Sequence, residues 1–135
     1  MKWYLTALRK YATFSGRAGR KEYWMFVLFN VVFMFALWLV GVIPGILSKN
    51  EVYKYLGLAL YWAYILALLV PGLAVSVRRL HDVGWSGWYL FLGLIPVVGV
   101  IILIVKYCAE GTPGTNQYGA NPKENTSIIS THPPD

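Results

Sequence analysis

Charged residues are scarce in this chain, at 13% of its 135 positions, about half of the roughly 25% found in soluble domains. They are missing altogether from three long runs, at residues 23–48, 55–77 and 83–105. A soluble domain of this size has no interior that could bury three such runs, each able to cross the roughly 30 Å hydrocarbon core of a bilayer. The scarcity of charge excludes a disordered chain and a nucleic-acid-binding globule, and it predicts a protein that crosses a membrane more than once.

Cysteine and histidine are also scarce. Cys108 is the only cysteine, so no disulfide forms within the chain and a secreted disulfide scaffold is excluded. The two histidines are His81 and His132, and one of them lies near the C-terminus, which makes a metal site a poor interpretation. No cofactor is predicted. The absence of charge within the runs also argues against a proton-coupled transporter or an ion pump, because these usually need a charged residue there.

The three apolar runs predict an all-α integral membrane fold, a small bundle of three transmembrane helices. The expected spans are about 23–47, 55–77 and 88–108. The third is interrupted by Gly93, Pro96 and Gly99, and two interpretations stay open. It forms either one kinked crossing or two half-helices in a re-entrant hairpin that leaves on the face where it entered. Length and continuous apolar character favour the crossing, whereas the distribution of charge favours the hairpin.

The two ends of the chain differ from these runs. Residues 1–14 place a basic strip beside an apolar face rich in Trp and Tyr. This pattern predicts an amphipathic helix that lies in the headgroup region or docks on the end of the bundle. Residues 1–110 are expected to form one membrane domain. From residue 111 the composition changes to Gly, Thr, Pro, Asn and Ser, so residues 111–135 are predicted to be a polar, largely disordered tail.

The basic residues set the predicted orientation. Half of the twelve precede the first run: Lys2, Arg9, Lys10, Arg17, Arg20 and Lys21. This bias places the N-terminus in the cytoplasm, beside anionic lipid. Three crossings then put Arg78 and Arg79 on the same side, with eight basic residues inside and four outside. With a hairpin in place of the third crossing, the counts become ten and two, and both versions satisfy the positive-inside bias.

Polar and small residues within the spans indicate helix packing. Asn30 is the one strongly polar side chain of the first span, and it is expected to form a hydrogen bond with a neighbouring helix. Ala59, Ala63 and Ala67 place a small residue at every fourth position of the second span. Such a face lets another helix approach closely, so we predict that these alanines meet a neighbouring helix.

The densest group of polar side chains follows the second span, at residues 78–88. His81, Asp82 and Ser86 suggest a Ser–His–Asp triad. However, Asp82 follows His81 directly, which does not place its carboxylate to orient the imidazole, and Ser86 lacks a nucleophile-elbow pattern. A structural role, in which the Arg pair reaches headgroups and Asp82 pairs or caps, fits the segment better. The chain is therefore predicted not to be an enzyme.

The same segment contributes to a predicted surface for an anionic headgroup or a protein partner. Its residues are Arg17, Arg20, Arg78, Arg79, His81 and Asp82. In the favoured topology both Arg-rich segments lie at the cytoplasmic face. Guanidiniums grip a phosphate in a bidentate fork that Lys does not reproduce. Asp82 and Glu22 are expected to pair internally and so fix the Arg orientations.

Two functions from different classes follow. The first is a non-catalytic membrane component that binds a partner membrane protein or anionic lipid through its basic cytoplasmic face. The second is a small channel or transporter, formed by a homo-oligomer, in which the broken third span lines a path. The second function requires a water-filled cavity at the level of residues 93–99. Neither function involves nucleic acid.

Four blocks of the sequence follow one another in chain order: FSGRAGRKEYW at 14–24, RRLHDVGWSGW at 78–88, LIPVVG at 94–99 and GTPGTNQYG at 111–119. Together they resemble the bacterial DUF805 family of small inner-membrane proteins. The resemblance covers about residues 10–122. It implies an all-helical protein of the bacterial cytoplasmic membrane, and it implies no activity, cofactor or catalytic residue.

Overall fold

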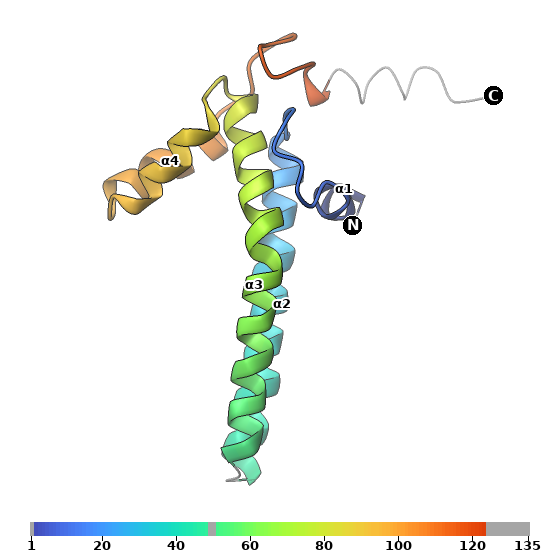
Figure 1. Ribbon diagram of the computed structural model, residues 1–135, viewed down its shortest axis with the longest axis vertical. Helices are drawn as coiled ribbons and strands as arrows, with labels where there is room; N and C mark the ends of the chain where they lie inside the picture. The colour runs from blue at the N-terminus through green and yellow to red at the C-terminus, as the bar shows by residue number, and fades with distance from the viewer. Residues whose placement is uncertain (1, 49–50, 124–135) are drawn as a thin grey trace, which may run out of the picture.

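The computed structural model describes residues 2–48 and 51–123 (Figure 1). These residues form four α-helices and one 3-10 helix: α1 (Lys2–Arg9), α2 (Arg20–Ser48), α3 (Glu51–Asp82), η1 (Gly87–Leu94) and α4 (Val98–Cys108). The described part of the chain contains no strand, only an isolated bridge between Asn116 and Gly119. The predicted all-α class is confirmed.

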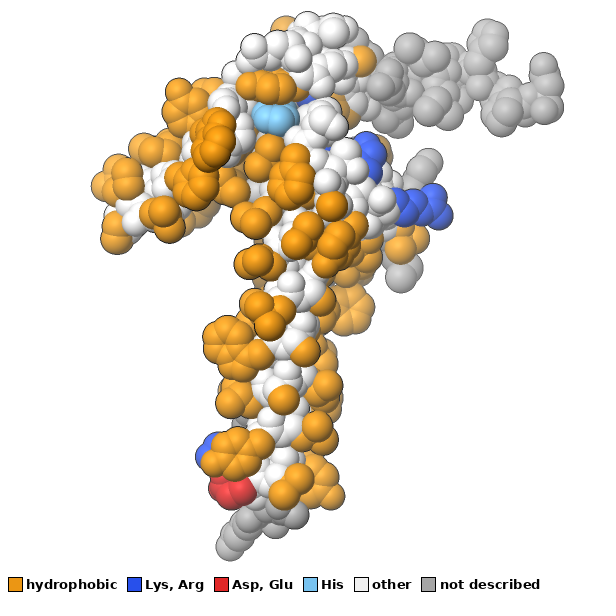
Figure 2. All heavy atoms as spheres, in the orientation of Figure 1, with side chains coloured by type: hydrophobic (Ala, Val, Ile, Leu, Met, Phe, Trp, Pro, Cys, Tyr) orange, Lys and Arg blue, Asp and Glu red, His pale blue; other side chains and the backbone are white. Residues whose placement is uncertain are grey.

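Helices α2 and α3 run side by side along the long axis of the molecule (Figure 1). Within residues 2–48 and 51–123 they are the two helices that are long and apolar enough to cross a membrane. Hydrophobic side chains are exposed along both of them (Figure 2). An exposed apolar surface of this extent is suited to lipid and not to water. The first two predicted spans correspond to α2 and α3, which extend a few residues beyond the expected bounds.

Two glycines let α2 and α3 approach each other closely. A Cβ atom added to Gly57 of α3 would lie 2.2 Å from the Cα atom of Gly41 in α2, so no larger residue fits without separating the helices. The face predicted for close packing is a different one. Its members Ala59, Ala63 and Ala67 are exposed, because α3 turns Gly57 and not the alanines toward α2.

Asn30 joins the two helices further along the pair. Its Oδ1 atom accepts a hydrogen bond of 2.8 Å from the Tyr64 hydroxyl of α3. Its Nδ2 atom donates to the carbonyl oxygen of Phe26, one turn earlier in α2, at 2.6 Å. The buried amide thus has a partner at each end, which is what a polar group in an apolar surrounding requires.

Helix α1 docks against α2, beside the pair of long helices. It ends at Arg9, five residues before the end that the sequence predicted. The Tyr4 ring stacks on Phe26 with 6.0 Å between ring centroids, and Ala7 is completely buried. After the helix, the Tyr11 hydroxyl donates to the carbonyl oxygen of Ala67 in α3 at 2.7 Å. Of the two predicted arrangements for this helix, docking on the bundle is therefore present in the structure.

The sequence favoured one kinked crossing for residues 88–108, but in the structure these residues do not form one continuous helix. Helices η1 and α4 instead fold back on each other, and the chain turns between them at Pro96 and Val97. Val97 has a φ of 64°, in the left-handed region that a β-branched residue rarely adopts. Gly99 permits the fold-back, because a Cβ atom there would lie 1.7 Å from the Leu92 carbonyl oxygen. Pro96 cannot donate to a continuous helix, and the backbone contact at Gly99 then closes the turn.

The two ends of this hairpin, which we call the arm, lie at the same end of α3. Gly87 faces Val77, because a Cβ added to this glycine would meet the Val77 side chain at 2.7 Å. At the other end of the arm, the Tyr107 carbonyl oxygen accepts a hydrogen bond of 3.1 Å from Arg79 Nε. The arm projects sideways from the helix pair (Figure 1) and carries exposed hydrophobic side chains (Figure 2).

The segment that follows α4 returns over the end of α3. The backbone N–H of Thr112 donates to the Asp82 carbonyl oxygen at 2.8 Å, and Asn116 Nδ2 donates to the His81 carbonyl oxygen at 2.9 Å. Part of the sequence assigned to the polar tail is thus bonded to the helical domain. The remainder of that tail, residues 124–135, lies outside the described residues.

Candidate functional site

Three segments that are far apart in the sequence meet where α2 begins and α3 ends. We call them the polar cap: residues 9–22, 78–82 and 109–123 (Figure 1). They meet because α2 and α3 are antiparallel, and because the arm begins and ends at the same end of α3. The cap contains every residue of the predicted surface: Arg17, Arg20, Arg78, Arg79, His81 and Asp82.

Asp82 forms the centre of the cap. Its Oδ1 atom accepts a hydrogen bond of 2.9 Å from Arg17 Nε, and its Oδ2 atom accepts one from Arg79 Nη1 at 2.5 Å. The three side chains are 5%, 1% and 0% exposed. Gly111 lies so close that an added Cβ would be 2.3 Å from Asp82 Oδ2. One buried carboxylate is therefore held between two guanidiniums, with a glycine backbone closing the space.

The remaining donors of these two arginines bind the segment around the end of α4 and beyond it. Arg17 Nη2 donates to the Thr112 carbonyl oxygen at 2.6 Å, and Arg17 Nη1 donates to the Gly114 carbonyl oxygen at 2.7 Å. Arg79 Nε donates to the carbonyl oxygen of Tyr107. Because guanidinium donors have a fixed geometry, these bonds define where the C-terminal segment lies on α3.

A second buried ion pair joins the start of α2 to the end of α3. Glu22 Oε1 accepts a hydrogen bond of 2.6 Å from Arg78 Nη1, and both side chains are at most 5% exposed. The backbone N–H of Ala18 donates to the Arg78 carbonyl oxygen at 2.9 Å. Arg78 Nε and Nη2 are buried without a hydrogen-bond partner in the described part of the chain. Buried donors of this kind are ordinarily satisfied by water or by a ligand oxygen.

Burial changes the interpretation of the predicted surface. Arg17, Arg78 and Arg79 are inside the cap, where their side chains bind protein groups and cannot reach a headgroup. Arg20 is different, with a side chain that is 42% exposed. The sequence located the cluster, but within it Arg20 is the guanidinium that faces outward.

His81 and Ser86 have local structural partners. The His81 ring stacks on Tyr118 with 3.8 Å between centroids, and its Nδ1 atom is 3.2 Å from the Gly16 carbonyl oxygen. The Ser86 hydroxyl accepts a hydrogen bond from the backbone N–H of Trp88 and caps η1. Neither side chain contacts Asp82 through a hydrogen bond that the described residues show. The three residues are thus not arranged as a Ser–His–Asp triad.

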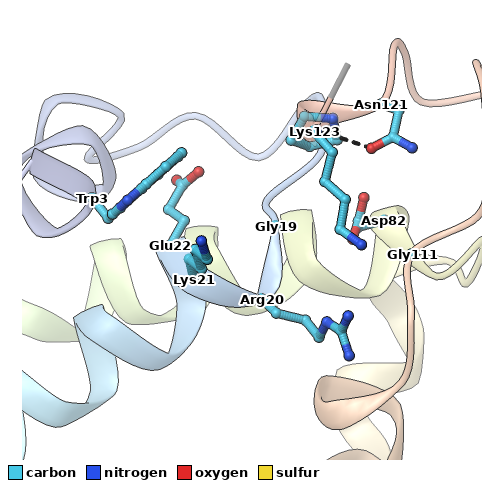
Figure 3. A pocket seen from close by; sticks show the side chains of 10 residues that line it. Trp3, Gly19, Arg20, Lys21, Glu22, Asp82, Gly111, Asn121 and Lys123 are labelled. Atoms are coloured by element: carbon cyan, nitrogen blue, oxygen red, sulfur yellow. Dashed lines mark hydrogen bonds between the residues drawn. The ribbon is translucent and has the colours of Figure 1, made fainter. Parts of the chain in front are cut away.

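A pocket of about 320 Å³ opens in the polar cap. Trp3 of α1 forms one side, Arg20 and Lys21 of α2 lie along it, and Lys123 reaches in from the C-terminal segment (Figure 3). The carboxylates of Glu22 and Asp82 also contribute to the wall, together with Gly19, Gly111, Asn121 and Pro122. The pocket is therefore bordered both by carboxylates of the buried ion pairs and by exposed cations.

Glu110 connects two of these cations at the surface. Its Oε1 atom accepts hydrogen bonds from Arg20 Nη2 at 3.0 Å and from Lys123 Nζ at 2.5 Å. The hydrogen bond from Lys123, together with the charges of Lys123 and Arg20, lowers the pKa of the Glu110 carboxyl. Glu110 is consequently ionised at neutral pH, and it acts as an internal anion for the two cations.

Trp3, Lys21, Gly111 and Lys123 belong to this site, although the sequence did not assign them to it. Trp3 was assigned to an interfacial helix, and Lys123 to the tail. The one available signal was the block at 111–119, which belongs, with the two Arg-rich blocks, to the family resemblance of the sequence. An ordered motif in a segment of turn-forming composition indicates a fixed backbone, as the cap requires around Asp82.

Comparison with known proteins gives a family. Residues 11–120 match the family described as "Protein of unknown function (DUF805)". The chain belongs to the DUF805 family. The inner membrane protein YhaI of Escherichia coli (strain K12) is 44% identical over 126 residues, which cover 91% of this chain and 97% of YhaI. The inner membrane protein YhaH of the same strain is 44% identical over 125 residues, covering 91% and 98%. The predicted family is confirmed.

A more distant similarity extends to the uncharacterized protein YiiR of Escherichia coli (strain K12), which is 27% identical over 139 residues, covering 83% of this chain and 87% of YiiR. No solved structure matches this DUF805 chain. The relatives YhaI and YhaH are inner membrane proteins, in agreement with the two long apolar helices. This DUF805 chain is accordingly a helical membrane protein, similar over nearly its whole length to proteins of the bacterial inner membrane.

Proposed function

We propose that this DUF805 protein is a non-catalytic component of the bacterial inner membrane that binds anionic phospholipid through its polar cap. The observation that carries the proposal is the distribution of charge within the cap. Its buried guanidiniums face buried carboxylates, so the exposed side chains determine the surface potential. The exposed cations are Arg9, Lys10, Arg20, Lys21 and Lys123, and the described part of the cap exposes one carboxylate, that of Glu110.

This surface is suited to an anionic membrane leaflet. Each Lys or Arg near such a leaflet contributes about 1 kcal/mol of attraction. The opposite end of the helix pair differs, because Glu51 and Lys54 form an exposed ion pair of 3.2 Å there. The excess of positive charge at one end supports a cytoplasmic polar cap, with the N-terminus inside.

The positive-inside distribution of charge also supports a topology of two crossings. In the proposed arrangement α2 and α3 cross the bilayer, and the arm enters the cytoplasmic leaflet as a re-entrant hairpin. The side chains at its tip, Leu94, Ile95 and Val97, are apolar and exposed. Transfer of apolar side chains from water into hydrocarbon lowers the free energy. Both ends of the described chain then lie on the cytoplasmic side.

Labelling of cysteines tests this topology. Cys108 is exposed at the base of the arm, and we expect a membrane-impermeant maleimide to label it in inside-out vesicles and not in spheroplasts. Glu51→Cys, in a Cys108→Ser background, should give the opposite result, because residue 51 begins α3 at the far end of the pair. Labelling of both positions from the same side would contradict the two-crossing arrangement.

Lipid preference tests the function. The full chain is purified in mixed micelles that contain equal amounts of phosphatidylglycerol and phosphatidylcholine, and the bound lipid is counted by native mass spectrometry. Phosphatidylglycerol should be enriched about 5-fold, because roughly 1 kcal/mol of preference corresponds to that ratio. High salt should reduce the enrichment, since exposed charges are screened. Equal occupancy by both lipids would contradict the proposal and would favour a protein partner for the cap.

The alternative function, a channel lined by the broken segment at residues 93–99, lacks an observation in its favour. These residues form the tip of the arm, which projects away from the helix pair (Figure 1). They line neither the cap pocket nor a second cavity of about 400 Å³ near the far end of the pair, which Gly41 and Gly57 line. A water path would need polar groups around a cavity, and lipid binding at the cap is the better supported function.

A further inference from the structure

The pocket of the polar cap collects three cations around a space of ligand size. Arg20 and Lys21 come from the first turn of α2, whereas Lys123 comes from the segment after α4 (Figure 3). The cations therefore belong to two separate parts of the chain, which the fold brings to one pocket. Its volume of about 320 Å³ is at the lower end of the roughly 300–1,000 Å³ range of small-ligand sites.

The carboxylates in the pocket wall do not cancel this positive charge. Glu22 is paired with Arg78, and Asp82 is paired with both Arg17 and Arg79. Both carboxylates of the wall are thus paired with buried guanidiniums, so they do not neutralise the exposed cations of the pocket. Arg78, directly behind Glu22, also has two donors without a hydrogen-bond partner among the described residues, so its protein neighbours do not satisfy it completely.

Glu110 indicates the kind of group that the cations accept. One carboxylate oxygen receives hydrogen bonds from both Arg20 and Lys123. The Glu110 side chain is 67% exposed, and exposed ion pairs are weak. A phosphodiester presents two charged oxygens, as a carboxylate does, and it can accept charge-assisted hydrogen bonds from the same donors. It can therefore displace Glu110 without breaking any of the buried pairs.

Trp3 indicates that the pocket lies at the level of the lipid headgroups. Trp side chains are enriched at the level of lipid headgroups, and this one forms the wall that α1 contributes. We infer that the pocket binds the phosphate group of an anionic phospholipid through Arg20, Lys21 and Lys123, and that Glu110 occupies two of these cations when no lipid is bound. This inference rests on the proposed function, for which it identifies the binding site.

The test compares two double variants with the same loss of charge. Phosphatidylglycerol binding to the full chain in mixed micelles is titrated by native mass spectrometry. Arg20→Ala with Lys123→Ala should lower the affinity about 5- to 10-fold, because two of the three charged donors to the phosphate are removed. Arg9→Ala with Lys10→Ala removes two exposed cations of the cap that do not line the pocket, and it should lower the affinity less than the pocket pair does, because the donors to the phosphate stay in place. Glu110→Gln should raise the affinity about 3-fold, since it removes the competing carboxylate.

The possible results separate the pocket from the general function. If the wild-type chain prefers phosphatidylglycerol but both double variants lose the same affinity, the pocket is overturned and the proposed function stands. If the wild-type chain shows no preference, the proposed function itself is overturned. Inorganic phosphate is titrated in parallel. If the pocket variants lose phosphate binding while phosphatidylglycerol binding is unchanged, the lipid is overturned as the source of the phosphate group. Unfolding midpoints of the variants verify that each chain is folded.

Discussion

Replacing Asp82 with Asn is expected to lower the free energy of unfolding by about 3–5 kcal/mol, which is typical for removing one partner of a buried ion pair. The carboxylate stands between Arg17 and Arg79, and each of the three side chains is at most 5% exposed. An amide has the same size and no charge, so the variant leaves two guanidiniums buried beside each other without a counter-charge. Chemical unfolding of the full chain in detergent micelles measures the difference.

The matched control is Glu51→Gln at the other end of the helix pair. Glu51 and Lys54 are three positions apart, as Arg79 and Asp82 are. However, the side chains of Glu51 and Lys54 are 66% and 65% exposed. The loss of this pair should change the free energy of unfolding by less than about 0.5 kcal/mol. If Asp82→Asn has an effect as small as the control, the polar cap is not held together by its buried ion pairs.

The buried pairs explain how a short chain positions its exposed cations. Ion pairs inside a protein add little net stability compared with apolar side chains of similar volume, so their presence here is better understood through geometry. Asp82 connects the turn before α2, the end of α3 and the segment after α4, because its partners Arg17 and Arg79 also donate to the carbonyl oxygens of Thr112 and Ala109 in that segment. Lys123 can reach the pocket only when this segment lies over α3.

The long helices could be predicted from the sequence because a backbone in hydrocarbon must satisfy its own hydrogen bonds, and an α-helix does so within one segment. The same reasoning located the cluster. Bilayer thickness confines the Arg-rich segments to a single layer once α2 and α3 are antiparallel. The expected pairing of Glu22 and Asp82 with Arg side chains is also present.

The direction of each Arg side chain could not be predicted in the same way. Whether Arg78 reaches a headgroup or a carboxylate depends on where Glu22 lies, fifty-six positions earlier in the chain. The hairpin of the arm could not be predicted for a similar reason. A run of apolar residues has the same composition in a crossing and in a fold-back, and the contact between Gly99 and Leu92 that closes the arm is visible only in three dimensions.

Replacing Gly57 with Ala is expected to lower the free energy of unfolding by about 1–3 kcal/mol, the usual cost of overpacking. The added methyl group would lie 2.2 Å from the Cα atom of Gly41 and 3.2 Å from its carbonyl carbon. Both are backbone atoms, which no change of rotamer can move away. The helices must therefore separate at this point, and van der Waals contacts along the outer half of the pair are lost. Unfolding of the full chain in mixed micelles with an increasing fraction of a denaturing detergent measures the change.

Gly72→Ala provides the control within the same helix. A Cβ atom at Gly72 would have Phe26 Cε1 as its nearest neighbour, at 4.0 Å, which is an ordinary contact, and Ala has the higher helix propensity. This variant should be at least as stable as the wild-type chain. Since both substitutions add one methyl group to a glycine of α3, a difference between them reports the space next to each residue and not the change in composition. Equal stability of the two variants would mean that α2 and α3 are not in backbone contact at Gly41, and the packing face of α3 would then have to be sought elsewhere, beginning with the exposed alanines.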